Sequence, residues 1–201
     1  MSDVMALDIE TGNFSWEIGG WDKTASFEPT VVATWNGDSG NVYCNESLSI
    51  DATVKALHPR TLGDDLSDHI EKGGTIIGHN IKSFDLPVLR DALDCWTAGD
   101  MLKSDSVIDT KNLVNKASLS QQKVMTDLNS LVKHTLGDSK LMNSEDAPTA
   151  WRNGRYDEVA KYCLSDARLT YDLYSFGKSE GYVRSRAVDT GQIIEVEVNW
   201  N

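Results

Sequence analysis

An apolar run with acids set into it constrains the fold of this chain most. Residues 5–9 are apolar except at Asp8, and Glu10 follows directly. A buried acid costs several kcal/mol unless a partner compensates for it. On a strand, Asp8 and Glu10 would point to one face, where a divalent cation such as Mg²⁺ or Mn²⁺ would offset their repulsion. Taken alone, the stretch favours a strand end with two solvated acids, because D-x-E arises readily by chance.

Length and composition predict one soluble domain over residues 1–201. The chain is long enough to bury a substantial core, and its 40% hydrophobic and 25% charged residues are ordinary for a globular protein. We expect no signal peptide and no membrane partner, because nothing approaches the ~20 apolar residues of a membrane span. Three cysteines without a C-x-x-C motif argue against a zinc site or a disulfide framework and favour the cytoplasm.

The net charge of −12 argues against broad electrostatic gripping of a long nucleic-acid duplex. A small site that holds phosphate through bridging metal ions stays compatible, because bound ions reverse the local sign of charge. Solubility or adaptation to high salt would explain the same acidity.

The first part of the chain predicts antiparallel strands. Residues 4–10, 16–21 and 30–35 have the composition of strands, and turn chemistry at 36–40 leads into a returning strand at 41–44.

Helical spacing then alternates with short strands. Asp85 is expected as a helix N-cap, with Pro87 in the first turn. The predicted helices cover residues 62–70, 85–89, 126–136 and 157–174, and the predicted strands cover 75–78, 107–108 and 191–198. The pattern predicts one α/β domain with a mixed central sheet flanked by helices.

A second acidic motif joins a predicted strand end to a helix start. Asn80, Phe84 and Asp85 form N-x-x-x-F-D, which is much rarer by chance than D-x-E. Asp85 would face the end of the sheet that carries Asp8. Helix capping alone would also account for it.

A third acidic motif lies on the long predicted helix. Tyr162 and Asp166 are four residues apart and share a face with Val159 and Thr170. An acid on this apolar side again needs a partner. A core tyrosine beside a solvated or ion-paired aspartate is the alternative.

The order D-x-E, N-x-x-x-F-D, Y-x-x-x-D resembles the DEDD (DnaQ-like) superfamily of 3′–5′ exonucleases, which has an RNase H-like fold. The tyrosine resembles the subtype found in stand-alone predicted exonucleases and in proofreading domains of family-B DNA polymerases. The resemblance covers residues 4–176 and leaves 180–201 as a C-terminal strand extension. With no polymerase or helicase domain on this chain, such a partner would act in trans.

The resemblance implies hydrolysis of the terminal phosphodiester of single-stranded DNA or RNA, releasing nucleoside 5′-monophosphates. Asp8, Glu10 and Asp166 would hold one divalent ion, Mg²⁺ or Mn²⁺. Asp8 would bridge to a second ion, which Asp85 would reach largely through water. Two ions ~3.5–4 Å apart stabilise both the attacking and the leaving oxygen.

The resemblance gives Tyr162 the task of orienting the attacking water, since a phenol with a pKa of ~10 is a poor base at neutral pH. Thr11, Asn80 and Phe84 would lie at the 3′-terminal nucleotide, and a purely structural role in their loops is the alternative for the first two. Most of the six tryptophans are expected in the core or at a sheet edge, with Trp151 proposed to stack on a base.

Two other functions stay open. A structure-selective endonuclease could use the same metal site, because that site does not require a free end. A non-catalytic RNase H-like binding module is the alternative from another class, although all four acids are retained here.

Overall fold

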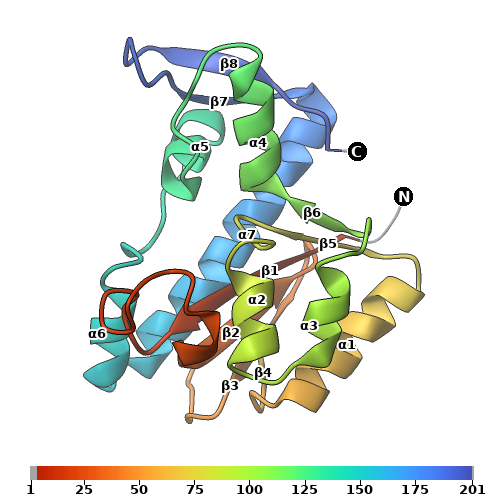
Figure 1. Ribbon diagram of the computed structural model, residues 1–201, viewed down its shortest axis with the longest axis vertical. Helices are drawn as coiled ribbons and strands as arrows, with labels where there is room; N and C mark the ends of the chain where they lie inside the picture. The colour runs from red at the N-terminus through yellow and green to blue at the C-terminus, as the bar shows by residue number, and fades with distance from the viewer. Residues whose placement is uncertain (1–3, 201) are drawn as a thin grey trace.

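The computed structural model describes residues 4–200, which form a mixed six-stranded sheet with helices on both faces and a separate two-stranded sheet (Figure 1). The prediction of an α/β fold with a mixed central sheet is confirmed. Among residues 4–200, no helix combines the length and the hydropathy needed to cross a membrane.

The central sheet is built around its first strand. Strand β1 pairs antiparallel with β2 and parallel with β5, so it lies inside the sheet. The expected hairpin is present, because β2 and β3 pair antiparallel. In the order β4-β3-β2-β1-β5-β6, the strands are β1 (Val4–Thr11), β2 (Pro29–Trp35), β3 (Gly40–Cys44), β4 (Thr53–Lys55), β5 (Thr75–Gly78) and β6 (Val107–Asp109).

The strand predicted at residues 16–21 is wrong. This segment forms turns that lead to a short 3-10 helix, η1 (Thr24–Ser26). Gly19 and Gly20 have φ angles of +90° and +133°, a left-handed backbone that breaks an extended strand. Residues 12–28 therefore form a long connection between β1 and β2, which we call the β1–β2 loop.

The predicted helices are present, with different ends. The long helix α7 continues to Glu180 and ends at Gly181, whose φ of +80° suits the left-handed residue that follows a helix. Three helices had no predicted counterpart: α3, α4 and α6. The helices are α1 (Pro59–Glu71), α2 (Asp85–Asp91), α3 (Trp96–Met101), α4 (Thr110–Leu119), α5 (Leu128–Thr135), α6 (Ala147–Arg152) and α7 (Tyr156–Glu180).

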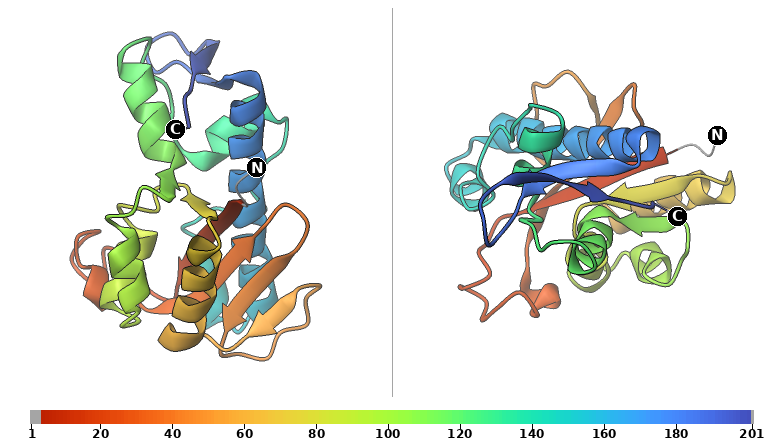
Figure 2. Two further views of the ribbon diagram at one scale, coloured as in Figure 1. Left: turned by 90° about the vertical axis from the view of Figure 1, so that its right-hand side faces the viewer. Right: turned by 90° about the horizontal axis from the view of Figure 1, so that it is seen from above.

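The sheet separates two halves of the core (Figure 2). Ala6 of β1 packs in the half that contains α7, whereas Leu7 and Ile9 pack against α1, α2 and α3. This alternation also fixes the acids of β1, because Asp8 and Glu10 share the parity of Ala6. The face toward α7 is thus where the sequence places its two carboxylates.

The C-terminal residues form their own antiparallel pair. Strands β7 (Tyr182–Arg186) and β8 (Ile193–Glu197) make a hairpin at the far end of the molecule from β3 and β4 (Figure 1). The strand predicted at 191–198 is confirmed, but its partner β7 was not predicted. Thr135 of α5 fixes the hairpin, donating to the Arg184 carbonyl oxygen at 3.0 Å.

Candidate metal centre

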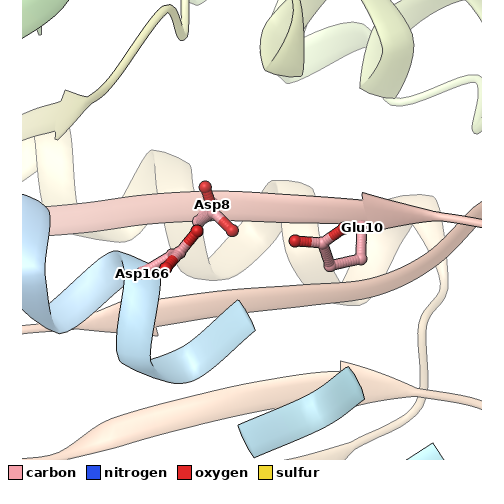
Figure 3. A group of neighbouring side chains, drawn as sticks. All are labelled: Asp8, Glu10 and Asp166. Carbon is pink, nitrogen blue, oxygen red and sulfur yellow. The ribbon is translucent and has the colours of Figure 1, made fainter. Parts of the chain in front are cut away.

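Three carboxylates from two elements meet beside the middle of the sheet. Asp8 and Glu10 come from β1, and Asp166 comes from α7, which crosses that face. Each offers an oxygen, and these oxygens all lie within 4.8 Å of one another. Figure 3 shows the Asp8 and Asp166 carboxylates close together, with that of Glu10 pointing back toward them. Glu10 and Asp166 are buried, and Asp8 is partly buried.

The cluster is short of positive charge. Burial raises the pKa values of Asp8 and Glu10 well above their ordinary range, and repulsion from Asp166 adds to both shifts. Asp8 Oδ2 and Asp166 Oδ1 are buried without any hydrogen-bond partner. Buried carboxylate oxygens without donors are rare because they are costly, and a divalent cation is the partner that hard oxygen ligands suit. The donor set therefore fits Mg²⁺ or Mn²⁺.

Lys140 lies at this cluster and was not predicted from the sequence. Its Nζ lies 2.5 Å from Asp166 Oδ2 and 3.1 Å from Ser144 Oγ, and its side chain is only 15% exposed. The ammonium also lies 4.9 Å from the centre of the Tyr162 ring. Nothing in the local sequence distinguishes it from a surface lysine in a polar loop. Only the fold brings this loop over the acids.

Tyr162 stays neutral at every physiological pH. It is fully buried, and burial raises the pKa of its phenol far above the usual value, with Glu10 and Asp166 adding to the shift. Its hydroxyl lies 3.1 Å from Ser144 Oγ. Burial raises the pKa of Asp166, and the Lys140 ammonium and, to a smaller extent, this phenol oppose that shift. A neutral phenol here can orient a neighbouring oxygen but cannot remove its proton.

Asp85 lies in the same cavity as Asp8 and Glu10 but outside the group of three. Its prediction as an N-cap is wrong, because Phe84 is the cap and Asp85 is the first helical residue. Asp85 is buried, and Asn80, whose φ angle is +76°, lies in the turn that precedes α2. Burial raises the pKa of Asp85 to about 7, against opposing backbone N–H groups that include that of Ile9.

The three predicted substrate residues line the same cavity, whose volume is about 790 Å³. Thr11 Oγ1 donates to the Asn13 carbonyl oxygen at 3.0 Å, and the Asn80 N–H donates to Asp109 Oδ1 at 3.2 Å. These two residues thus also have structural roles. Phe84 packs edge-on against a neighbouring phenylalanine. Contact with a nucleotide stays a prediction for all three.

The tryptophans are placed differently from the prediction. Trp151 packs against Tyr156 with ring centres 4.6 Å apart and does not line the cavity. Trp16 and Trp21 do line it and are 64% and 66% exposed, and Trp96 is 80% exposed elsewhere. The expectation of core or sheet-edge positions is wrong for these three.

Comparison with known proteins adds no assignment. No family model matches the chain, and none of the curated proteins compared with it is similar to it. Chemically, the cluster offers hard oxygen ligands that could hold a divalent cation, and it lies beside a neutral phenol, a lysine and an open cavity.

Proposed function

We propose that this protein is a metal-dependent 3′–5′ exonuclease of the DEDD superfamily, tyrosine subtype, with an RNase H-like fold. One observation carries the proposal: Asp8, Glu10 and Asp166 converge within 4.8 Å, and two of their buried oxygens lack a partner. The mixed sheet with helices on both faces is the architecture that such a fold would have.

The described residues supply ligands for the two ions of this chemistry. Asp8, Glu10 and Asp166 would hold the first ion, and Asp8 with Asp85 would hold the second. When bound, two Mg²⁺ or Mn²⁺ ions supply a nucleophilic water at neutral pH and stabilise charge that develops on the phosphate oxygens. The raised pKa values of Asp8 and Glu10 mean that metal binding would release protons.

Tyr162 and Lys140 have distinct roles in this proposal. The Tyr162 hydroxyl would orient the attacking water by a hydrogen bond. The raised pKa of this phenol keeps it protonated, so it cannot act as the base that takes a proton from the water. The Lys140 ammonium compensates Asp166 in the metal-free protein. Once an ion takes over that compensation, the ammonium would be free to contact the phosphate.

The cavity suits the unpaired end of a strand. Its volume of about 790 Å³ falls within the ~300–1,000 Å³ typical of small-molecule sites, which matches one or two nucleotides rather than a duplex. DNA and RNA both fit this proposal, and a polymerase or helicase would act as a partner in trans. The buried free cysteines, Cys44, Cys95 and Cys163, support a cytoplasmic location.

One observation favours a second candidate, the non-catalytic binding module. The contact of Lys140 with Asp166 already neutralises one acid without any metal. In a module that never binds metal, this ion pair would be the permanent state of the site. The endonuclease alternative uses the same residues and differs from the exonuclease only in that it needs no strand end.

A degradation ladder separates these functions. Single-stranded DNA and RNA labelled at the 5′ end are incubated with the protein and Mg²⁺, Mn²⁺ or chelator. We expect shortening from the 3′ end that chelator and Asp166→Asn both abolish, whereas Asp38→Asn, an exposed acid in the β2–β3 turn, has no effect. Cleavage of a circular strand would establish the endonuclease, and no cleavage of any substrate would favour the binding module.

A further inference from the structure

The β1–β2 loop carries two aromatic side chains that the proposed chemistry does not use. Trp16 and Trp21 are both about two-thirds exposed and line the cavity that contains Asp8. Tryptophan is highly buried in most proteins, so two exposed indoles beside one functional cavity require an explanation. Core packing does not explain Trp16 or Trp21, because both side chains are largely exposed.

The loop is held in place by side-chain hydrogen bonds. Asn13, which is buried, donates to the Ser26 carbonyl oxygen at 2.8 Å and accepts from the Glu28 N–H at 3.0 Å, which closes the base of the loop. Arg152 of α6 pairs with Glu17 at 2.6 Å. The indoles are therefore presented by a fixed scaffold, which lowers the entropy lost on binding.

Each indole is supported by a second ring. Trp16 stacks on Phe14, with ring centres 4.2 Å apart and planes inclined by 16°. Trp21 contacts Phe84 edge-on, with ring centres 5.4 Å apart, and also lies 6.0 Å from the Phe27 ring. Phe84 directly precedes Asp85 in the chain, so the ring contact between Trp21 and Phe84 places Trp21 next to the candidate metal centre. These contacts fix the rings while leaving both indoles accessible.

The charge of the cavity indicates how a nucleic acid could bind there. Among the described residues that line it, seven are acids, and only Lys111 and Lys140 are positively charged, because burial lowers the pKa of His79 to about 3. Two lysines cannot neutralise several phosphates, and the proposed ions would act on the terminal phosphodiester. The phosphates of the preceding nucleotides therefore cannot supply most of the affinity. Stacking of bases on aromatic rings supplies affinity without positive charge and tolerates any sequence, because every base has a π face.

We propose that Trp16 and Trp21 form a base-stacking platform for the unpaired nucleotides next to the 3′ end of a single-stranded nucleic acid. The inference rests on the proposed exonuclease function and names the part of the protein that selects single strands. Bases inside a duplex are stacked on both sides by their neighbours, whereas unpaired bases can splay out onto an indole. The protein thereby discriminates against duplex ends without any base-specific hydrogen bond.

Binding to a labelled single-stranded 12-mer tests the platform, measured by fluorescence anisotropy with Ca²⁺ in the buffer. Trp16→Leu and Trp21→Leu should each raise the Kd about tenfold, a size typical of one lost base–aromatic stack. The Phe substitutions keep a π face and should stay within about threefold of the unchanged protein. A 12-mer with abasic sites near its 3′ end lacks the bases that would stack. The wild-type protein should therefore bind it with a Kd similar to that of the Leu variants for the intact 12-mer.

Trp96→Leu is the matched control, because this tryptophan is exposed on α3 and does not line the cavity. Thermal unfolding of each variant checks that the fold is retained. Unchanged affinity in both Leu variants, tight binding of the abasic strand, or equal losses for Leu and Phe would overturn the proposal. The last result would indicate an apolar surface for a protein partner.

Hydrolysis of the p-nitrophenyl ester of thymidine 5′-monophosphate by the unchanged protein separates the two proposals. This ester has no neighbouring nucleotides, so its cleavage depends on the metal centre alone. Strand binding that needs the tryptophans, without ester hydrolysis, would support the platform and refute the nuclease. Metal-dependent ester hydrolysis, together with strand binding that the tryptophan substitutions do not change, would support the nuclease and refute the platform.

Discussion

Replacing Lys140 with methionine removes its charge while keeping most of its bulk. Lys140 Nζ lies 2.5 Å from Asp166 Oδ2, and the two side chains are 15% and 3% exposed. In the variant, Asp166 would be buried among other acids with no cation nearby. We expect the metal-free protein to lose stability and to bind divalent ions more tightly, because the ammonium no longer competes for the carboxylates.

The size of the loss is limited by protonation. Removing one partner of a buried ion pair costs ~3–5 kcal/mol. Asp166 can instead take up a proton, which for an acid of ordinary pKa ~3.9 costs ~1.36 × 3.1, or about 4 kcal/mol, at pH 7. We therefore expect a loss of about 3–4 kcal/mol. At ~2–4 °C per kcal/mol for a chain of this size, Tm should fall by about 6–16 °C.

The pH dependence of this loss identifies its cause. Burial already raises the pKa of Asp166, and without the opposing Lys140 ammonium that pKa would rise further, so stability should fall more steeply with rising pH in the variant than in the wild-type protein. At pH 5 the cost of protonating Asp166 is only ~1.36 × 1.1, or about 1.5 kcal/mol. The difference in folding stability between Lys140→Met and the wild-type protein should therefore be smaller at pH 5 than at pH 7.

Calorimetric or fluorimetric melting at pH 5 and pH 7, in chelator and in Mn²⁺, measures both effects. Lys103→Met removes an exposed lysine and is the matched control. Mn²⁺ at about 100 times its Kd stabilises a protein by ~2.7 kcal/mol. At one fixed Mn²⁺ concentration, the rise in Tm should therefore be larger in Lys140→Met, which binds the ion more tightly, than in the control. Equal Tm values and equal Mn²⁺ shifts in the two variants would refute the charge-compensating role of Lys140.

Two further predictions concern the same site, and a third concerns the packing at the end of β5. Tyr162→Phe should slow hydrolysis about 10²-fold with nearly unchanged Mn²⁺ affinity by titration calorimetry, because the phenol orients water and binds no metal; a loss of affinity would contradict that role. The raised pKa values of Glu10 and Asp85, the latter about 7, mean that the folded protein binds protons more readily than the unfolded chain. Metal-free stability should therefore fall as pH rises from about 4 to 7 while Mn²⁺ affinity increases, and melting curves that showed the opposite slope would refute this. Gly78→Ala would place a methyl group 2.5 Å from Ile81 Cβ, so unfolding experiments should show a loss of about 1–3 kcal/mol, and an unchanged Tm would be inconsistent with the close packing there.

The acids of β1 could be predicted from the sequence because strand alternation is a local rule. Asp8 and Glu10 had to share a face, and the structure places both on the α7 side of the sheet. Asp166 joined them in the prediction through its place on an apolar helix face. In each case a carboxylate interrupts an apolar pattern, which is a signal that a single sequence can carry.

Other features depend on contacts distant in sequence. Lys140 lies in a polar loop, and only the packing of that loop over α7 brings its ammonium to Asp166. The segment at 16–21 has the aromatic content of a strand, yet Gly19 and Gly20 take φ angles that no strand allows. Strand β7 is short and, within residues 4–200, pairs only with strand β8, so its own sequence pattern gave little indication of it.

Anomalous diffraction from crystals soaked in Mn²⁺ and thymidine 5′-monophosphate tests the metal centre most directly. We predict one anomalous peak for a Mn²⁺ ion bound by Asp8, Glu10 and Asp166, and a second peak for an ion between Asp8 and Asp85. We also predict that the Lys140 ammonium moves away from Asp166. The absence of a peak among these carboxylates, with the Lys140–Asp166 ion pair intact, would contradict a metal-dependent nuclease.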